Sequence, residues 1–308
     1  MSAQRLKNRW KLSIIISSMV CLDYLRDSVL RDFSRGGRAG SFHRTTRHAG
    51  LLGLVLMILA STTYAVESNL QELLSQGEAF EQKRETKQAI KVFLAAEKLA
   101  PTNSEVLIKL AKQYSDLIFE TPIEAEQKKL AERCLDYARR AVGCNPTNAR
   151  AHLSVAICLA KNFPYIDNQT KVDYSREVKE RTEKAIALDP RQDLAYHMLG
   201  RWHFEVADMN KILKLLMKAI YGGLPKGTYE LAATNFKNAV ELAPGRVIHR
   251  VELARTYLKS GDRKSAIEQL KSSLAFKPTD KDDIEAQSTA KKMLKELGVK
   301  PEAPLNQA

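Results

Sequence analysis

The sequence has little glycine, proline or aromatic side chain. Its 308 residues include 14 Gly and 10 Pro, and Phe, Trp and Tyr together account for 7%. Tight turns between strands depend on glycine and proline, so their scarcity argues against a sheet-rich fold. Alanine, leucine, lysine and glutamate are abundant instead, and these residues favour helices. The composition predicts a chain that is helical over most of its length.

Motifs of catalysis and metal binding are missing as well. The sequence contains no glycine-rich phosphate loop, no GxSxG elbow and no HExxH motif. His197 and His203 are six residues apart, so on a helix they point to different sides and make a poor metal pair. Paired carboxylates such as Glu177 and Glu180 lie on polar helix faces. We therefore expect no catalytic residue, no metal and no cofactor.

The four cysteines, Cys21, Cys134, Cys144 and Cys158, form no CxxC or Cys/His ligand spacing. Cys134 falls where helix packing favours a small buried side chain, and we predict that it is a free thiol in the core. The sequence does not by itself require an oxidising compartment.

Acidic residues are rare at the N-terminus. The first 50 residues carry ten Lys or Arg against three Asp. Such a start suggests targeting, so we assign residues 1–49 to a basic targeting or disordered segment. Farther along, basic residues alternate with acidic ones and no aromatic-basic stripe occurs. Nucleic acid is therefore not an expected partner.

One apolar run, residues 50–66, follows the basic segment. It is about 17 residues long, the lower limit for crossing a bilayer. Three interpretations stay open: a membrane anchor, an organelle transit region, or a signal peptide whose true start lies inside this chain, with cleavage near Ala65. The first two predict a membrane- or organelle-associated protein with cytosolic repeats, with the mitochondrion as the expected organelle. The third predicts a secreted or periplasmic protein.

A helix-pair repeat begins after this run. Leu73, Gly77 and Phe80 share one helical face, and Ala89, Phe93 and Ala96 share a face of the next predicted helix. A small residue lets two helices approach, and an aromatic ring fills the space beside it. A proline then ends the second helix. Such prolines recur at Pro101, Pro146, Pro190, Pro244 and Pro278.

These units resemble tetratricopeptide (TPR) repeats. We predict an all-α fold, a right-handed α-solenoid of about five TPR-like helix pairs over residues 67–298. A polar helix over residues 283–297 is expected to cap it, followed by a tail over residues 299–308.

The longest departure from the repeat is an insertion, residues 205–228. Its apolar residues Leu213, Leu216, Met217 and Ile220 share one face of a helix that carries lysines elsewhere. One interpretation is a helix that packs on the solenoid. The other is a helix that lies over the groove or contacts a lipid or a membrane.

The run DLAYHMLGRWHFEVADM at residues 193–209 is similar to sequences of the regulator of microtubule dynamics family. The resemblance continues through GGLP, TYELAATNFKNAVELAP and HRVELARTYLKSGDRKSAIEQLKSSLAFKPTDKDD, and it covers residues 73–297. It implies a helical-repeat adaptor associated with microtubules, and in one branch with the outer mitochondrial membrane and with lipid. That branch uses an acidic two-phenylalanine motif for tethering, which this sequence lacks.

The repeat register also predicts a partner-binding groove. The first helix of each pair lines the concave face, and the residues assigned to it are Lys112, His197, Arg201, Phe204 and Arg255. Lys112, Arg201 and Arg255 occupy equivalent places in three units, which suits an acidic peptide or a phospholipid head group. The family resemblance implies tubulin as one acidic partner. The alternative is that these cations pair with carboxylates of neighbouring helices.

Overall fold

The computed structural model describes residues 67–301. The expected basic segment 1–49, the apolar run 50–66 and all but the start of the tail 299–308 lie outside the described residues.

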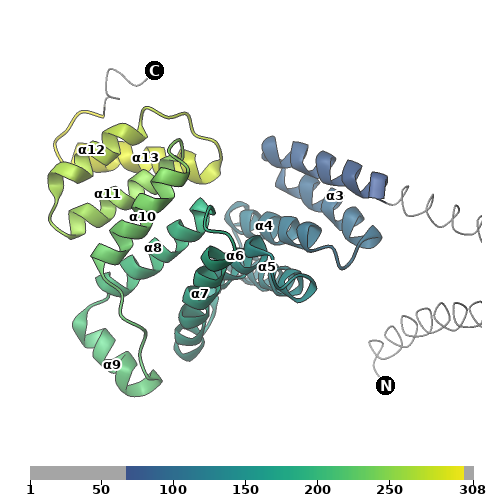
Figure 1. Cartoon of the computed structure of the whole chain (residues 1–308), viewed down its shortest axis with the longest axis horizontal. Helices are drawn as coiled ribbons and strands as arrows, with labels where there is room; N and C mark the ends of the chain where they lie inside the picture. The colour runs from purple at the N-terminus through teal and green to yellow at the C-terminus, as the bar shows by residue number, and fades with distance from the viewer. Residues whose placement is uncertain (1–66, 302–308) are drawn as a thin grey trace, which may run out of the picture. The chain divides into compact units, whose positions relative to one another are not determined.

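Helices make up most of the described chain (Figure 1). The first spans residues 67–82. The others, in chain order, are α3 (Thr86–Leu99), α4 (Ser104–Glu120), α5 (Glu124–Cys144), α6 (Ala149–Asn162), the short 3₁₀ turn η1 (Phe163–Tyr165), α7 (Asn168–Leu188), α8 (Asp193–Asp208), α9 (Lys211–Tyr221), α10 (Tyr229–Leu242), α11 (Val247–Lys259), α12 (Arg263–Ser273) and α13 (Lys281–Glu296). No strand occurs between residues 67 and 301.

The helices pack in pairs. The helix of residues 67–82 packs on α3, α4 on α5, α6 on α7, α8 on α10 and α11 on α12. α13 packs on α11 and α12 at the end of the array. This arrangement confirms the predicted all-α fold of TPR-like pairs with a capping helix.

The prolines and their neighbours set the helix boundaries. α3, α5, α7 and α10 each end two residues before a proline, which disfavours helical geometry at the residue preceding it. Asn103 and Asn148, two residues after Pro101 and Pro146, then cap the next helix. The Asn103 side chain accepts hydrogen bonds from the backbone N–H groups of Glu105 and Val106. One short motif therefore ends one helix and starts the next.

Two glycines allow close contact inside their pairs. A Cβ atom added at Gly77 would lie 2.3 Å from the Phe93 ring, and one added at Gly200 would lie 2.9 Å from the Phe236 ring. Both phenylalanines are fully buried. The small-and-aromatic match that the sequence suggests for the first pair therefore recurs between α8 and α10.

We expect Gly200→Ala to lower the unfolding free energy by about 1–3 kcal/mol, because the added methyl group must displace the Phe236 ring. Gly143→Ala is the matched control, since a Cβ there would meet nothing within 4 Å and alanine favours a helix by up to about 1 kcal/mol. Urea unfolding of both variants measures the difference. Equal midpoints would contradict the close packing of α8 on α10.

The prediction of a free Cys134 thiol is wrong. Cys134 of α5 and Cys158 of α6 form a disulfide between neighbouring helix pairs, with their Cα atoms 5.6 Å apart. Both are buried. Sequence spacing gives no sign of this bond because the two cysteines belong to different pairs. Cys144 is the free, exposed cysteine of the described part.

Candidate functional site

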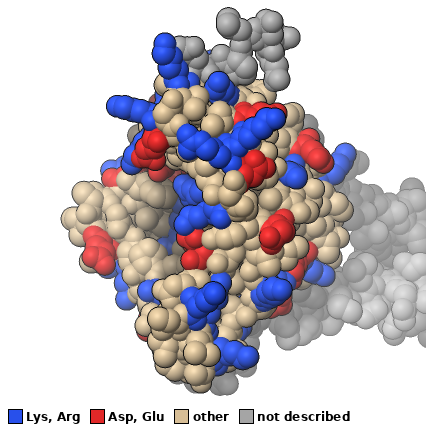
Figure 2. Space-filling view, turned by 90° about the vertical axis from the view of Figure 1, so that its left-hand side faces the viewer, with Lys and Arg blue, Asp and Glu red and all other residues tan. Residues whose placement is uncertain are grey.

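A large cavity lies between helices of successive pairs. Its volume is about 1040 Å³. It is walled by α6, α7 and α8, bordered by α11 and α13, and covered on one side by α9. Small-molecule sites usually measure about 300–1,000 Å³, so this cavity is at the upper end of the range. Figure 2 shows the face that carries α9, with blue side chains beside a shaded hollow.

The cavity is apolar where α9 covers it. Leu213, Leu216, Met217 and Ile220 of α9 line it. The opposing wall has further apolar side chains from α6, α7 and α8: Ile157, Ala160, Val172, Val178, Leu194, Met198, Trp202 and Val206. Trp202 satisfies its polar atom by donating from Nε1 to the Ser175 carbonyl oxygen at 2.8 Å. The N–H group of the Trp202 ring is therefore already paired and leaves no unsatisfied donor in the apolar wall.

The charged groups that line the cavity lie mainly away from α9, on α8 and α11. Arg201 and Arg255 both contact Glu252, with nitrogen–oxygen distances of 3.5 and 3.2 Å. Arg201 also contacts Glu205 at 3.3 Å. The Glu252 side chain is buried, so two guanidinium groups share one carboxylate that has little access to water. The Arg201 Nε has no hydrogen-bond partner within the described residues.

Lys161 and Phe119 extend this polar end. The Lys161 ammonium lies 3.9 Å from the centre of the Phe119 ring, a cation–π contact. Burial lowers the pKa of Lys161, although Asp282 opposes the shift. Burial also raises the pKa of Asp282, helped by the nearby Asp280 carboxylate. No sequence pattern singles out Lys161, Phe119 and Asp282, because they meet only when α4, α6 and α13 are brought together.

A long-range contact brings α13 to this wall. Lys281, at the start of α13, forms an ion pair with Glu120 at the end of α4. The Thr86 hydroxyl donates to the same carboxylate at 2.6 Å. The contact joins residues that are far apart in sequence and places α13 beside the cavity.

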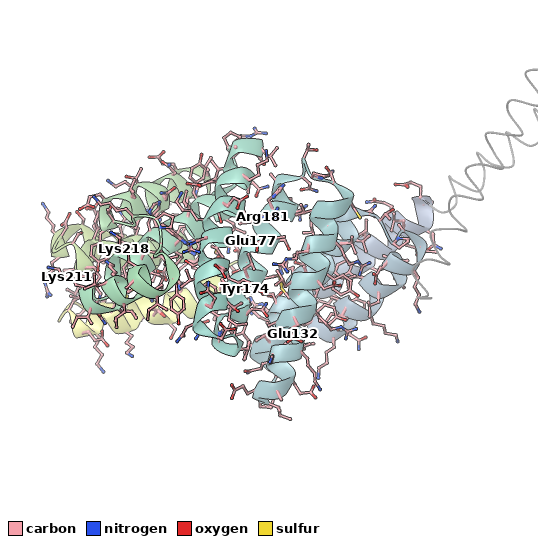
Figure 3. All side chains as sticks on the ribbon, turned by 90° about the horizontal axis from the view of Figure 1, so that it is seen from below. Glu132, Tyr174, Glu177, Arg181, Lys211 and Lys218 are labelled. Atoms are coloured by element: carbon pink, nitrogen blue, oxygen red, sulfur yellow. A yellow bond between two sulfur atoms is a disulfide. The ribbon has the colours of Figure 1, made fainter. Side chains whose placement is uncertain are left out.

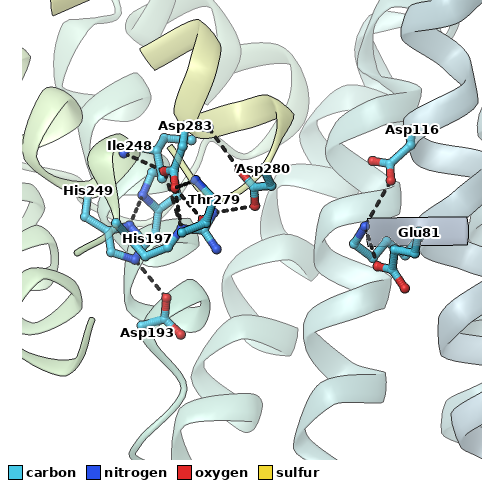
Figure 4. A network of polar contacts seen from close by, with 11 residues as sticks. Glu81, Asp116, Asp193, His197, Ile248, His249, Thr279, Asp280 and Asp283 are labelled. Atoms are coloured by element: carbon cyan, nitrogen blue, oxygen red, sulfur yellow. Dashed lines mark hydrogen bonds and ion pairs between the residues drawn. The ribbon is translucent and has the colours of Figure 1, made fainter. Parts of the chain in front are cut away.

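The cavity gathers most of the residues that the sequence assigned to binding. Arg201, Arg255 and His197 line it, as do all four apolar residues selected on α9. Lys112 lies elsewhere, between Glu81 at 2.7 Å and Asp116 at 3.0 Å, and this charged pair of contacts raises its pKa (Figure 4).

Phe204 does not line the cavity either. It is buried in a cluster with Phe236, Ala232 and Leu253. It follows His197 by seven residues, so the two lie on nearly the same side of α8, the edge that packs on α10 and α11. Arg201 therefore lies at the cavity, whereas Phe204 belongs to the adjoining core.

His197 belongs to a buried polar chain (Figure 4). Its Nδ1 lies 3.0 Å from Nδ1 of His249, and His249 Nε2 lies 2.8 Å from Asp193 Oδ2. Neutral imidazoles satisfy both contacts if His197 donates to His249 and His249 donates to Asp193. Burial, followed by the neighbouring His249 and Arg201, holds the pKa of His197 well below its usual value.

This pKa shift predicts a loss of stability in acid. The unfolded chain takes up a proton at His197 near pH 6.5 and the folded chain resists it, so the unfolding free energy falls as the pH drops below about 6.5. One histidine contributes a slope of about 1.4 kcal/mol per pH unit. His203, whose pKa burial also lowers, adds to it. Denaturation between pH 7.5 and 5.5 should show a smaller slope for His197→Asn; an identical slope would contradict the assignment.

Metal clusters and membrane-spanning helices are absent from the part of the chain that the structure describes. No group of three or more His, Cys, Asp or Glu side chains between residues 67 and 301 has the geometry to hold a metal ion. None of the helices in that range is long and apolar enough to span a bilayer.

The chain is similar in sequence to one family of proteins. The family model for regulator of microtubule dynamics protein 1-3 matches residues 73–298. Regulator of microtubule dynamics protein 1 of Pongo abelii is 29% identical over 276 residues, 86% of each chain. Protein 3 of Xenopus laevis is 30% identical over 193 residues, 62% of this chain and 42% of that protein.

A solved structure supports the fold. A TPR protein of Thermus thermophilus superposes with a TM-score of 0.53 at 19% identity, over 72% of this chain and 98% of that one. The fold, the repeats and the family match agree, and the chain belongs to the regulator of microtubule dynamics family.

Proposed function

We propose that this protein is a non-enzymatic lipid-binding repeat protein that holds an amphipathic lipid in the cavity beneath α9. The observation that carries the proposal is the division of the cavity into an apolar part and a charged end. An acyl chain fits the apolar part, because burying it between Leu213, Met217 and Met198 removes hydrocarbon from water.

The charged end suits a polar head group. Arg201 and Arg255 share the buried Glu252 carboxylate, Arg201 also contacts Glu205, and Arg201 Nε is unpartnered within the described residues. A phosphate oxygen at this position would receive charge-assisted hydrogen bonds from guanidinium groups. The size of the cavity favours a lipid over a small metabolite.

Native mass spectrometry of the purified full chain tests the proposal. We expect a species heavier by the mass of a lipid, which disappears at high activation energy and returns after incubation with phospholipid. A single unliganded mass before and after incubation would contradict it.

Protein scaffolding is the second candidate function, favoured by the TPR-like pairs and by the names of the relatives. Those proteins are named as regulators of microtubule dynamics, so tubulin or another acidic protein is the partner to test. Co-sedimentation of the full chain with microtubules would support this function, and loss of co-sedimentation on Arg201→Glu would assign it to the groove.

The location of the protein is a separate proposal. The apolar run 50–66 supports association with a membrane or an organelle, mitochondria by analogy with the family branch. The disulfide between Cys134 and Cys158 supports the alternative that the repeats face an oxidising compartment after cleavage near Ala65. Non-reducing peptide mapping of native protein and sequencing of its mature N-terminus would distinguish these.

A further inference from the structure

α9 stands apart from the paired helices (Figure 1). It is inserted between α8 and α10, the two helices of one pair, and it has no buried residue. Its most exposed large apolar side chains are Ile212, Leu215, Ile220 and Leu216, whose exposed fractions are 74%, 69%, 64% and 52%. We call these four residues the α9 outer face. A row of exposed apolar side chains along one helix indicates a surface that binds another molecule or a membrane.

Polar contacts define both ends of this helix. The Asn210 side chain caps its start by accepting from the Leu213 backbone N–H at 2.7 Å. At its end, the Arg176 guanidinium of α7 donates to the Gly223 carbonyl oxygen at 2.7 Å. Gly222 and Gly223 both adopt positive φ angles, which lets the chain turn sharply back. The segment therefore forms a capped helix that Arg176 joins to α7 at its C-terminal end.

The charged residues of α9 itself are all basic. Residues 209–229 contain Lys211, Lys214, Lys218 and Lys226 and no Asp or Glu. Lys211, Leu215 and Lys218 follow one another at helical spacing, so lysines flank the exposed leucine along the helix. Among the described residues, no carboxylate oxygen lies within 4.0 Å of Lys211 or Lys218. Figure 3 labels these two lysines on α9.

The positive charge and the exposed apolar side chains together indicate which kind of partner binds the α9 outer face. A second copy of the chain docked through the same face would bring lysines against lysines, which is unfavourable. An anionic bilayer complements both features, because lysines bind acidic head groups while their stems and the apolar side chains enter the interface. Leu216 and Ile220 also line the cavity, so the face continues into the cavity wall.

We propose that the α9 outer face docks the protein on the surface of an anionic membrane. Ile212 and Leu215 enter the head-group boundary, and Lys211 and Lys218 contact acidic lipids. Docking in this orientation turns the α9 side of the cavity toward the bilayer. The docking does not require a lipid to be present in the cavity.

Hydrogen exchange of the full chain tests this docking, because it reads α9 separately from the apolar run 50–66. Phosphatidylcholine vesicles containing phosphatidylserine should slow the exchange of the peptide covering residues 211–221, and phosphatidylcholine alone should not. Lys211→Glu with Lys218→Glu should raise the vesicle concentration needed for half protection by at least about tenfold. The matched control, Lys264→Glu with Lys277→Glu, makes the same charge change on exposed residues elsewhere and should leave it unchanged.

Two outcomes would overturn the docking proposal. One is exchange at residues 211–221 that anionic vesicles do not alter. The other is protection that rises with protein concentration in the absence of vesicles, which would assign the face to a second copy. Ile212→Glu with Leu215→Glu separates docking from cavity binding, because neither side chain lines the cavity. That variant should lose vesicle protection and keep the lipid adduct in native mass spectrometry.

Discussion

Filling the cavity from both sides, with Ala160→Trp on α6 and Leu216→Trp on α9, is expected to weaken phospholipid binding at least tenfold. Both positions line the cavity, and each substitution places an indole ring in the space that an acyl chain would occupy. A tenfold loss corresponds to about 1.4 kcal/mol, less than burying two methylene groups contributes. Titration with a phospholipid that carries a fluorophore on one acyl chain measures the effect.

The control adds the same number of rings outside the cavity. Ile212→Trp with Leu215→Trp changes two positions of α9 that do not line the cavity, and it should bind the probe as the unmodified protein does. Urea unfolding of both variants checks that the fold is retained. Equal probe affinity for the cavity variant and the control would show that the lipid binds elsewhere.

Phe236→Ala is expected to lower the unfolding free energy by about 3–5 kcal/mol, the largest stability loss that we predict. The ring is fully buried, fills the space above Gly200 and contacts the edge of His197 at a centroid distance of 5.5 Å. Its removal leaves a hole between α8 and α10 that the flanking helices can close only in part. Urea unfolding measures the loss.

Phe119→Ala serves as the comparison, since the same truncation at a ring that is mostly exposed should cost less than about 1 kcal/mol. If Phe236→Ala and Phe119→Ala destabilised the protein equally, the ring would not be the packing element of its pair. Because Phe236 also contacts His197, its loss should alter the acid sensitivity described above.

The repeat architecture was predictable from local signals. Gly77 and Phe93 match because the packing of one pair depends on two short helices that are adjacent in sequence. The prolines mark helix ends for the same reason. The face of α9 that lines the cavity also follows from helical periodicity, and Leu213, Leu216, Met217 and Ile220 all line it.

The remaining parts of the site depend on how successive pairs stack. The contact of Lys281 with Glu120 brings α13 to the cavity, and the angle between neighbouring pairs that makes it possible is not encoded in any single repeat. The disulfide between Cys134 and Cys158 likewise joins two pairs. Phe204 was assigned to the groove from the repeat register, and the packing of α10 on α8 places it in the core instead.

Photo-crosslinking of a lipid tests the central claim most directly. A phospholipid with a diazirine on one acyl chain would be incubated with the full chain, irradiated and mapped by peptide mass spectrometry. Binding in the cavity predicts adducts on peptides containing Met198, Met217 and Val178, which line its apolar part. Adducts found only outside the cavity-lining peptides of α6 to α9 would contradict the proposed lipid site.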